Sequence, residues 1–78
     1  LLRMVTRSPR HRALGEAIRS TRSQASLSQE QLALRCGLDR TYVGGIERGE
    51  RNPSYASLLR VADALDVPLS ALVARAGD

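Results

Sequence analysis

The chain has 78 residues, which is enough for one small domain, and its formal net charge is +4 at pH 7. Its only cysteine is Cys36 and its only histidine is His11, so an intrachain disulfide is excluded and the usual Cys/His metal sites cannot be assembled. No apolar run approaches the ~20 residues of a membrane span, and the first residues do not follow the pattern of a signal peptide. We therefore expect a cytoplasmic protein with no cofactor, no metal and no membrane partner.

The composition favours an all-α fold. Aromatic residues make up 3% of the chain, ten residues are alanine, and the β-branched runs that favour strands are missing. The chain contains 12 arginines and no lysine. Residues 1–27 hold six of these arginines and one acidic residue, Glu16. An arginine excess suits contact with phosphates, because the guanidinium group can bind two oxygens at once. A solvated basic face explains the same excess equally well.

The first ten residues show little hydrophobic periodicity and carry three arginines and a proline. We expect residues 1–10 to form a mobile basic arm and residues 11–76 to form the folded domain. From His11 onward, the residues of one helical face recur at intervals of three and four. They are Leu14, Ala17, Ile18, Thr21, Arg22 and Ala25. This pattern predicts a first helix that ends near residues 24–26.

Two short helices follow, and capping residues mark their ends. Ser28 and Gln31 form a capping box, in which the serine hydroxyl accepts from a free backbone N–H and the glutamine reaches back. Gly37 suits a left-handed cap at the end of this second helix, and Asp39 suits the N-cap of a third helix over residues 40–48. Two short helices joined by a turn of three to four residues with a glycine have the layout of a helix-turn-helix.

Two further helices complete the predicted fold. Ser54 should cap a fourth helix with an apolar inner face, and Pro68 fits the first turn of a fifth helix over residues 69–75. The sequence thus predicts five helices around an aliphatic core. Cys36 lies on an apolar stripe, so we expect it to fill the core rather than to act as a nucleophile.

The stretch LSQEQLALRCGLDRTYVGGIERGERNPS, residues 27–54, resembles a known DNA-binding family. It is similar to the helix-turn-helix proteins that include the phage lambdoid repressors and Cro, regulators of the xenobiotic-response-element type, and the controller proteins of restriction–modification systems. The resemblance extends over roughly residues 12–75. It implies a five-helix, lambda-repressor-like domain in a bacterial, nucleoid-associated transcriptional regulator, which usually acts as a dimer. Its third helix would enter the major groove of duplex DNA.

The third helix carries two adjacent glycines on the face that should meet DNA. On a helical wheel this outward face consists of Arg40, Thr41, Gly44, Gly45 and Arg48. The resemblance carries the family's base-reading positions onto the first four of these. The arginine could offer a fork to a guanine edge and the threonine a hydroxyl or methyl group. The glycines would let the backbone approach DNA closely, or they are merely tolerated on an exposed face.

Phosphate contacts are expected at helix ends. Gln29 lies beside the free N–H groups at the start of the second helix, and the resemblance implies that this position touches the DNA backbone. Arg48, Arg51 and Asn52, at the end of the third helix and in the next loop, are the expected flanking contacts. As alternatives, Gln29 is simply a good helix residue and Arg51 a solvated loop charge.

Arg22 lies in line with Leu14 and Ile18 on the buried face of the first helix. An unpaired buried charge is costly, and Glu47 on the third helix is the obvious partner. The resemblance implies the same arginine–glutamate bridge between these two helices. The alternative is that Arg22 extends to solvent.

The leading functional hypothesis is a sequence-specific transcriptional regulator that binds duplex DNA as a homodimer. Apolar residues in excess of one small core predict a C-terminal dimer interface; they are Leu59, Leu69, Leu72 and Val73. Alternatively, these leucines close the monomer core. An antitoxin-type interaction module, whose main partner is a toxin protein, is the alternative function. We do not expect an enzyme, because the sequence contains no Ser/His/Asp set, no suitably paired carboxylates and no phosphate loop.

Overall fold

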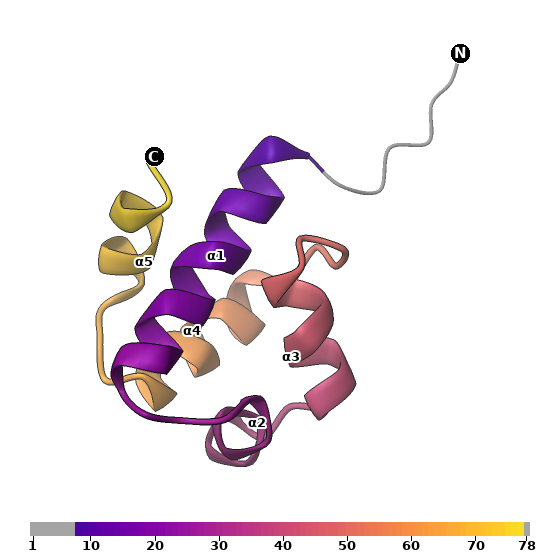
Figure 1. Ribbon diagram of the computed structural model, residues 1–78, viewed down its shortest axis with the longest axis vertical. Coiled ribbons are helices and arrows are strands. Elements are labelled where there is room, and N and C mark those ends of the chain that lie inside the picture. Colours follow the sequence, from indigo (N-terminus) through magenta and orange to yellow (C-terminus); the bar gives the residue numbers. More distant parts are fainter. Residues whose placement is uncertain (1–7, 78) are drawn as a thin grey trace.

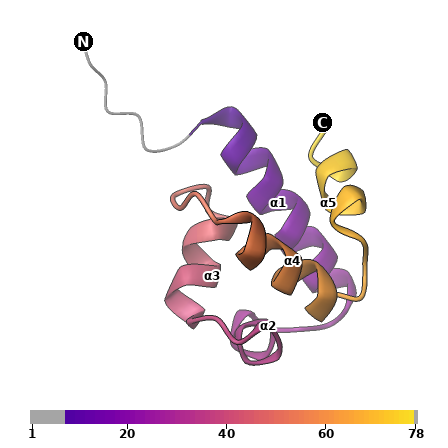
Figure 2. The same ribbon diagram turned by 180° about the vertical axis from the view of Figure 1, so that it is seen from behind.

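The computed structural model describes residues 8–77, and these residues form five helices and no strand. The helices are α1 (Pro9–Gln24), α2 (Gln29–Cys36), α3 (Arg40–Glu47), α4 (Tyr55–Ala64) and α5 (Leu69–Arg75). The all-α, five-helix prediction is therefore confirmed. In Figure 1 the long helix α1 crosses the domain, with α5 along one side and α3 on the other. Figure 2 shows α4 on the opposite face, with α2 beneath it.

The helix starts follow from side-chain caps at the residues that precede them. Ser8, Ser28, Asp39 and Ser54 have extended backbone angles, and each side chain accepts a hydrogen bond from a backbone N–H in the next turn. At α2 the capping box is complete, because Gln31 also accepts from the backbone N–H of the cap residue. Such caps matter for helices of eight residues, which are too short to be stable alone.

The core joins all five helices. Each helix contributes one almost fully buried aliphatic side chain: Ile18, Leu32, Val43, Val61 and Leu72. Burying such a side chain contributes about 1.5–3 kcal/mol. Smaller residues fill the space between them, including Cys36, which is 6% exposed. The core lies where α1 packs on α3 and α5, and where α2 packs on α3 and α4.

The expected N-terminal boundary is partly wrong. Pro9 and Arg10 belong to α1 rather than to an arm, because Ser8 caps the helix and proline is well suited to a first helical turn. The rest of the expected mobile arm, residues 1–7, lies outside the described part of the chain. At the other end, Pro68 takes the cap position of α5 rather than its first turn.

Candidate nucleic-acid interface

The turn between α2 and α3 brings two short helices together. Gly37 ends α2 in the left-handed conformation, with φ +69°, which glycine adopts without strain. Leu38 is half-buried against the core, and the Asp39 carboxylate accepts from the Thr41 backbone N–H at 2.9 Å. The layout predicted from the sequence is therefore present, with α3 held at the edge of the domain (Figure 1).

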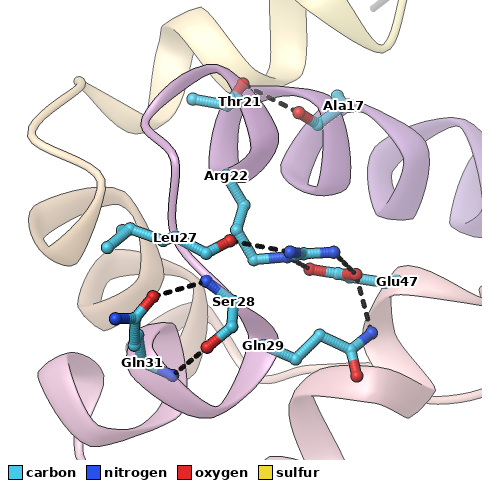
Figure 3. Close-up of polar contacts among 8 residues, drawn as sticks. All are labelled: Ala17, Thr21, Arg22, Leu27, Ser28, Gln29, Gln31 and Glu47. Atoms are coloured by element: carbon cyan, nitrogen blue, oxygen red, sulfur yellow. Dashed lines mark hydrogen bonds and ion pairs between the residues drawn. The ribbon is translucent and has the colours of Figure 1, made fainter.

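A buried ion pair joins α1 to the C-terminal end of α3. Nε of Arg22 donates to Oε2 of Glu47 at 2.6 Å, and Nη2 donates to Oε1 at 3.0 Å. The side chains are 12% and 2% exposed. Nη1 of Arg22 donates to the Leu27 carbonyl at 2.8 Å, so the pair also holds the chain between α1 and α2 (Figure 3). The predicted ion pair is therefore present. Because two N–H groups of Arg22 bind the two carboxylate oxygens of Glu47, the pair fixes the relative orientation of the two side chains as well as their separation.

Gln29 adds α2 to the same network. Its Nε2 donates to Oε1 of Glu47 at 2.9 Å, as Figure 3 shows. The Glu47 carboxylate on α3 therefore accepts hydrogen bonds from side chains of both α1 and α2. The sequence placed Gln29 at the start of α2, but it gave no sign of this bond, because the residues are 18 positions apart. Its expected contact with a DNA phosphate remains a prediction.

The first turn of α3 is open to solvent. Arg40 and Thr41 are both exposed, as a base-reading role requires. The second turn differs from the expectation, because Gly44 and Gly45 are buried rather than open. Long side chains lie across them: a Cβ on Gly44 would lie 3.1 Å from Nη1 of Arg48, and a Cβ on Gly45 would lie 2.6 Å from Cγ of Arg51.

The remaining expected phosphate contacts surround the C-terminal end of α3. Arg48, Arg51 and Asn52 are all exposed. Nε of Arg48 lies 3.1 Å from Oε1 of Glu50, and the guanidinium carbon of Arg51 lies 5.6 Å from the centre of the Tyr42 ring. The structure thus gathers three of the predicted phosphate-binding side chains near one end of α3.

Comparison with known proteins identifies the arrangement. A helix-turn-helix family model matches residues 18–72. The chain belongs to the helix-turn-helix family of DNA-binding transcriptional regulators. It is 47% identical over 64 residues to the control protein C.SmaI of Serratia marcescens, covering 82% of this chain and 76% of that protein.

Solved structures of helix-turn-helix proteins agree with this fold. The restriction–modification controller protein C.AhdI from Aeromonas hydrophila is 48% identical, with a TM-score of 0.78 over 78% of this chain and 92% of its own. The biofilm regulator SinR, solved in complex with DNA, is 33% identical, with a TM-score of 0.72 over 76% of this chain and 95% of its own. The predicted family resemblance, including that to controller proteins, is confirmed.

Close backbone packing in this helix-turn-helix domain was not expected from the sequence. A Cβ on Gly15 of α1 would lie 2.4 Å from the Ile46 carbonyl oxygen and 2.5 Å from that of Glu47. The backbones of α1 and α3 therefore approach closely at Gly15, at the same end of α3 that carries Glu47. The glycine itself could have predicted this contact. A glycine inside a helix lowers its stability, so its presence on a buried face indicates close packing.

The expected dimer surface needs one correction. Leu72 is 1% exposed and fills the monomer core, so its assignment to a dimer interface is wrong. Leu69 and Val73 are half-buried, and Leu59 is 37% exposed. These three residues keep surface that a second copy could cover, and their role in a dimer remains a prediction.

Burial raises the pKa of the Cys36 thiol, which makes the reactive thiolate less accessible and agrees with its expected role in the core. Among residues 8–77, no group of three His, Cys, Asp or Glu side chains could hold a metal ion. Every helix in this part of the chain is too short or too polar to cross a bilayer.

Proposed function

We propose that this protein is a homodimeric controller that binds paired half-sites in duplex DNA and regulates restriction–modification genes, its own among them. The observation that carries the proposal is the rigid attachment of α3. The carboxylate of Glu47 is held by Arg22 and Gln29, so the angle of α3 is fixed before DNA binds. The exposed first turn of α3 then enters the major groove with little rearrangement.

In this proposal Arg40 and Thr41 read base edges, and the glycines Gly44 and Gly45 form the second part of the same surface. Arg40 can donate two hydrogen bonds to the O6 and N7 atoms of a guanine. Thr41 contacts a neighbouring base through its hydroxyl or its methyl group. With only two such side chains on the helix itself, the shape of the DNA contributes the rest of the specificity.

Phosphates on both sides of the groove would meet donors at the helix ends. Gln29 and the backbone N–H groups at the start of α2 bind one strand. Arg48, Arg51 and Asn52 bind the other, and the positive charges of the two arginines make the affinity fall with salt. Such contacts set the register of the protein on DNA but do not read the sequence.

A second copy would pack through the C-terminal surface formed by Leu59, Leu69 and Val73. This contact places two α3 helices about 34 Å apart, which is one turn of DNA. Since the relatives are control proteins, self-regulation through protein concentration is the simplest mode of action. The proposed setting is the bacterial cytoplasm, at the nucleoid.

An antitoxin-type module remains the alternative function, although the relatives described above are controllers and regulators. Fluorescence anisotropy with the duplex upstream of the protein's own gene separates the two. We expect specific binding at least about 1,000-fold tighter than binding to a scrambled duplex of equal length at the same salt. Equal affinity for both duplexes would overturn the proposal, and a co-purifying toxin would then favour the alternative.

A further inference from the structure

The last helix of the domain depends on its neighbours for its direction. α5 has seven residues, and no side chain caps its start. A helix of this length is not stable alone, so contacts with the rest of the domain orient it. Leu72, in its middle, is the one buried residue of α5, and Leu69, at its start, packs against the same core. These two contacts fix the first half of α5 and leave its last turn to be fixed by other means.

Arg75 attaches that last turn to α1. Its Nη1 donates to Oγ1 of Thr21 at 3.2 Å and to Oε1 of Gln24 at 3.0 Å. The Thr21 hydroxyl donates its own hydrogen to the Ala17 carbonyl at 2.8 Å, so its oxygen is available to Arg75 only as an acceptor. One amino group of the guanidinium therefore binds two side chains that lie one turn apart on α1.

Side-chain packing does not fill the space around this contact. A groove lies between α1 and the end of α5, and most of the residues that line it are small. They are Ala13, Glu16, Ala17 and Ser20 on α1, and Arg75 and Ala76 at the end of α5. Because no large apolar side chain interlocks the two helices here, the hydrogen bonds of Arg75 are the contact that sets the angle of α5.

Two neighbouring residues of α1 hold two different helices. Thr21 binds α5 through Arg75, and Arg22 binds α3 through Glu47. Figure 3 shows that Thr21 and Arg22 leave α1 on opposite sides, and Figures 1 and 2 both show α1 between α5 and α3. Within one protomer, α1 therefore links the direction of α5 to the direction of α3.

We propose that Arg75 is a positioning residue for DNA recognition, which fixes the angle of α5 and thereby the separation of the two α3 helices in the dimer. Leu69 and Val73 of the proposed dimer surface lie on α5, so a turn of α5 would turn the whole partner. Each base pair rotates DNA by about 35°, so a dimer of fixed geometry fits one spacing of its half-sites. A dimer with a loosely held α5 would accept several. The inference rests on the homodimeric, DNA-binding function proposed above.

Half-site spacing is the quantity that tests this role. A duplex is selected by the parent protein from a randomised library, and affinities are measured for it and for versions with one or two base pairs added or removed between the half-sites. A duplex with a single half-site is measured beside them. The parent should bind the selected spacing more tightly than every other spacing.

Arg75→Met removes the donors and keeps a long side-chain stem. It should lower the preference for the selected spacing by about 2- to 10-fold, the effect of about one hydrogen bond. Its affinity for the single half-site should stay unchanged, and in sedimentation velocity the variant should remain dimeric. A residue that served only the stability of the fold would not produce this combination.

Thr21→Val removes the acceptor from the other side of the same contact with little change in volume, so it should lower the spacing preference as well. In the Arg75→Met background it should cause little further loss, because the two changes break one contact. Arg19→Met is the matched control. It removes the same charge from an exposed position on α1 and should leave the spacing preference unchanged.

Four outcomes would overturn the inference. If Arg75→Met and Thr21→Val keep the spacing preference of the parent, Arg75 does not set the geometry of the dimer. If Arg19→Met loses as much preference, the cause is the lost charge and not the contact. If Arg75→Met weakens binding to the single half-site by the same factor, the arginine supports the fold or touches DNA. If that variant sediments as a monomer, Arg75 belongs to the dimer contact itself. A parent protein with no preferred spacing would instead contradict the proposed dimeric function.

Discussion

At the scale of single residues, the molecule depends on the carboxylate of Glu47. Periodicity placed Arg22 on the buried face of its helix, and the cost of a buried charge pointed to an acidic partner. The structure contains that pair. The third member, Gln29, could not be predicted, because nothing local in the sequence relates α2 to the end of α3. Polar networks between distant segments depend on the tertiary packing that brings them together.

Removing this carboxylate should destabilise the fold. Glu47→Ala would leave the guanidinium of Arg22 buried without its charged partner, and we expect the free energy of unfolding to fall by about 3–5 kcal/mol. Denaturant titration measures this change. Arg48→Ala, which breaks the half-exposed pair with Glu50, is the control and should cost no more than about 1 kcal/mol.

The double change Arg22→Met with Glu47→Leu should recover most of the stability, because it leaves no buried charge. It should not recover operator affinity to the same extent, since the directional bridge between α1 and α3 is gone. Single variants that unfold at the same denaturant concentration as the parent would show that the pair contributes little.

Arg40→Ala tests base reading by the first turn of α3. Arg40 is exposed, so the variant should fold like the parent. Specific binding should weaken by about 1–3 kcal/mol, with relaxed preference at one base pair per half-site. Affinities for the selected duplex and for a scrambled duplex provide the measurement. An unchanged ratio between them would remove Arg40 from the base-reading surface.

At the scale of elements, most helix ends were predictable because their signals are local. Ser28, Gly37, Asp39 and Ser54 each cap the helix that the sequence assigned to them. The start of α1 was placed two residues late, because the hydrophobic pattern begins at His11 while the cap lies at Ser8. The covering of Gly44 and Gly45 was missed for another reason. Gly45 is covered by Arg51 from the loop after α3, and Gly44 by the side chains of Arg48 and Gln29. Helical periodicity describes neither of these contacts.

Gly15→Ala tests the close contact between α1 and α3. The new Cβ would meet two backbone carbonyl oxygens at 2.4 and 2.5 Å, so α3 has to shift. Despite the better helix propensity of alanine, we expect a loss of about 1–3 kcal/mol in unfolding free energy. Gly44→Ala, whose Cβ meets only the ends of the Arg48 and Gln29 side chains, at 3.1 and 3.4 Å, should be neutral or stabilising by up to about 1 kcal/mol. Equal stability of both variants would contradict the close contact.

At the scale of the whole molecule, the sequence analysis overestimated the apolar surface that remains exposed for a dimer contact. Leu72 was expected at a dimer interface, but it is the buried contribution of α5 to the core. A sequence can show that a residue lies on an apolar face, but the packing of α5 against α1 and α4 decides what covers it. The surface proposed for dimerisation is therefore smaller, and Leu69 and Leu59 become its main apolar residues.

Leu69→Glu should give a folded monomer that binds the operator weakly and without cooperativity, because a charge in the interface opposes association. Sedimentation velocity measures the mass in solution. Leu34→Glu is the matched control: Leu34 is 79% exposed on α2 and not on α4 or α5, which carry the proposed interface, so this variant should remain dimeric. If the Leu69→Glu variant remains dimeric, the interface lies elsewhere. If it unfolds, Leu69 belongs to the monomer core, and Leu59→Glu becomes the variant that tests the interface.

Methylation protection of guanines tests the central claim most directly, because it reports on N7 atoms in the major groove. The duplex selected by the protein is treated with and without it. Two protected clusters in inverted orientation are expected, with centres about 10 base pairs apart, as two α3 helices on one face of DNA require. A single protected cluster, or binding that leaves every guanine reactive, would contradict a dimer that reads the major groove through α3.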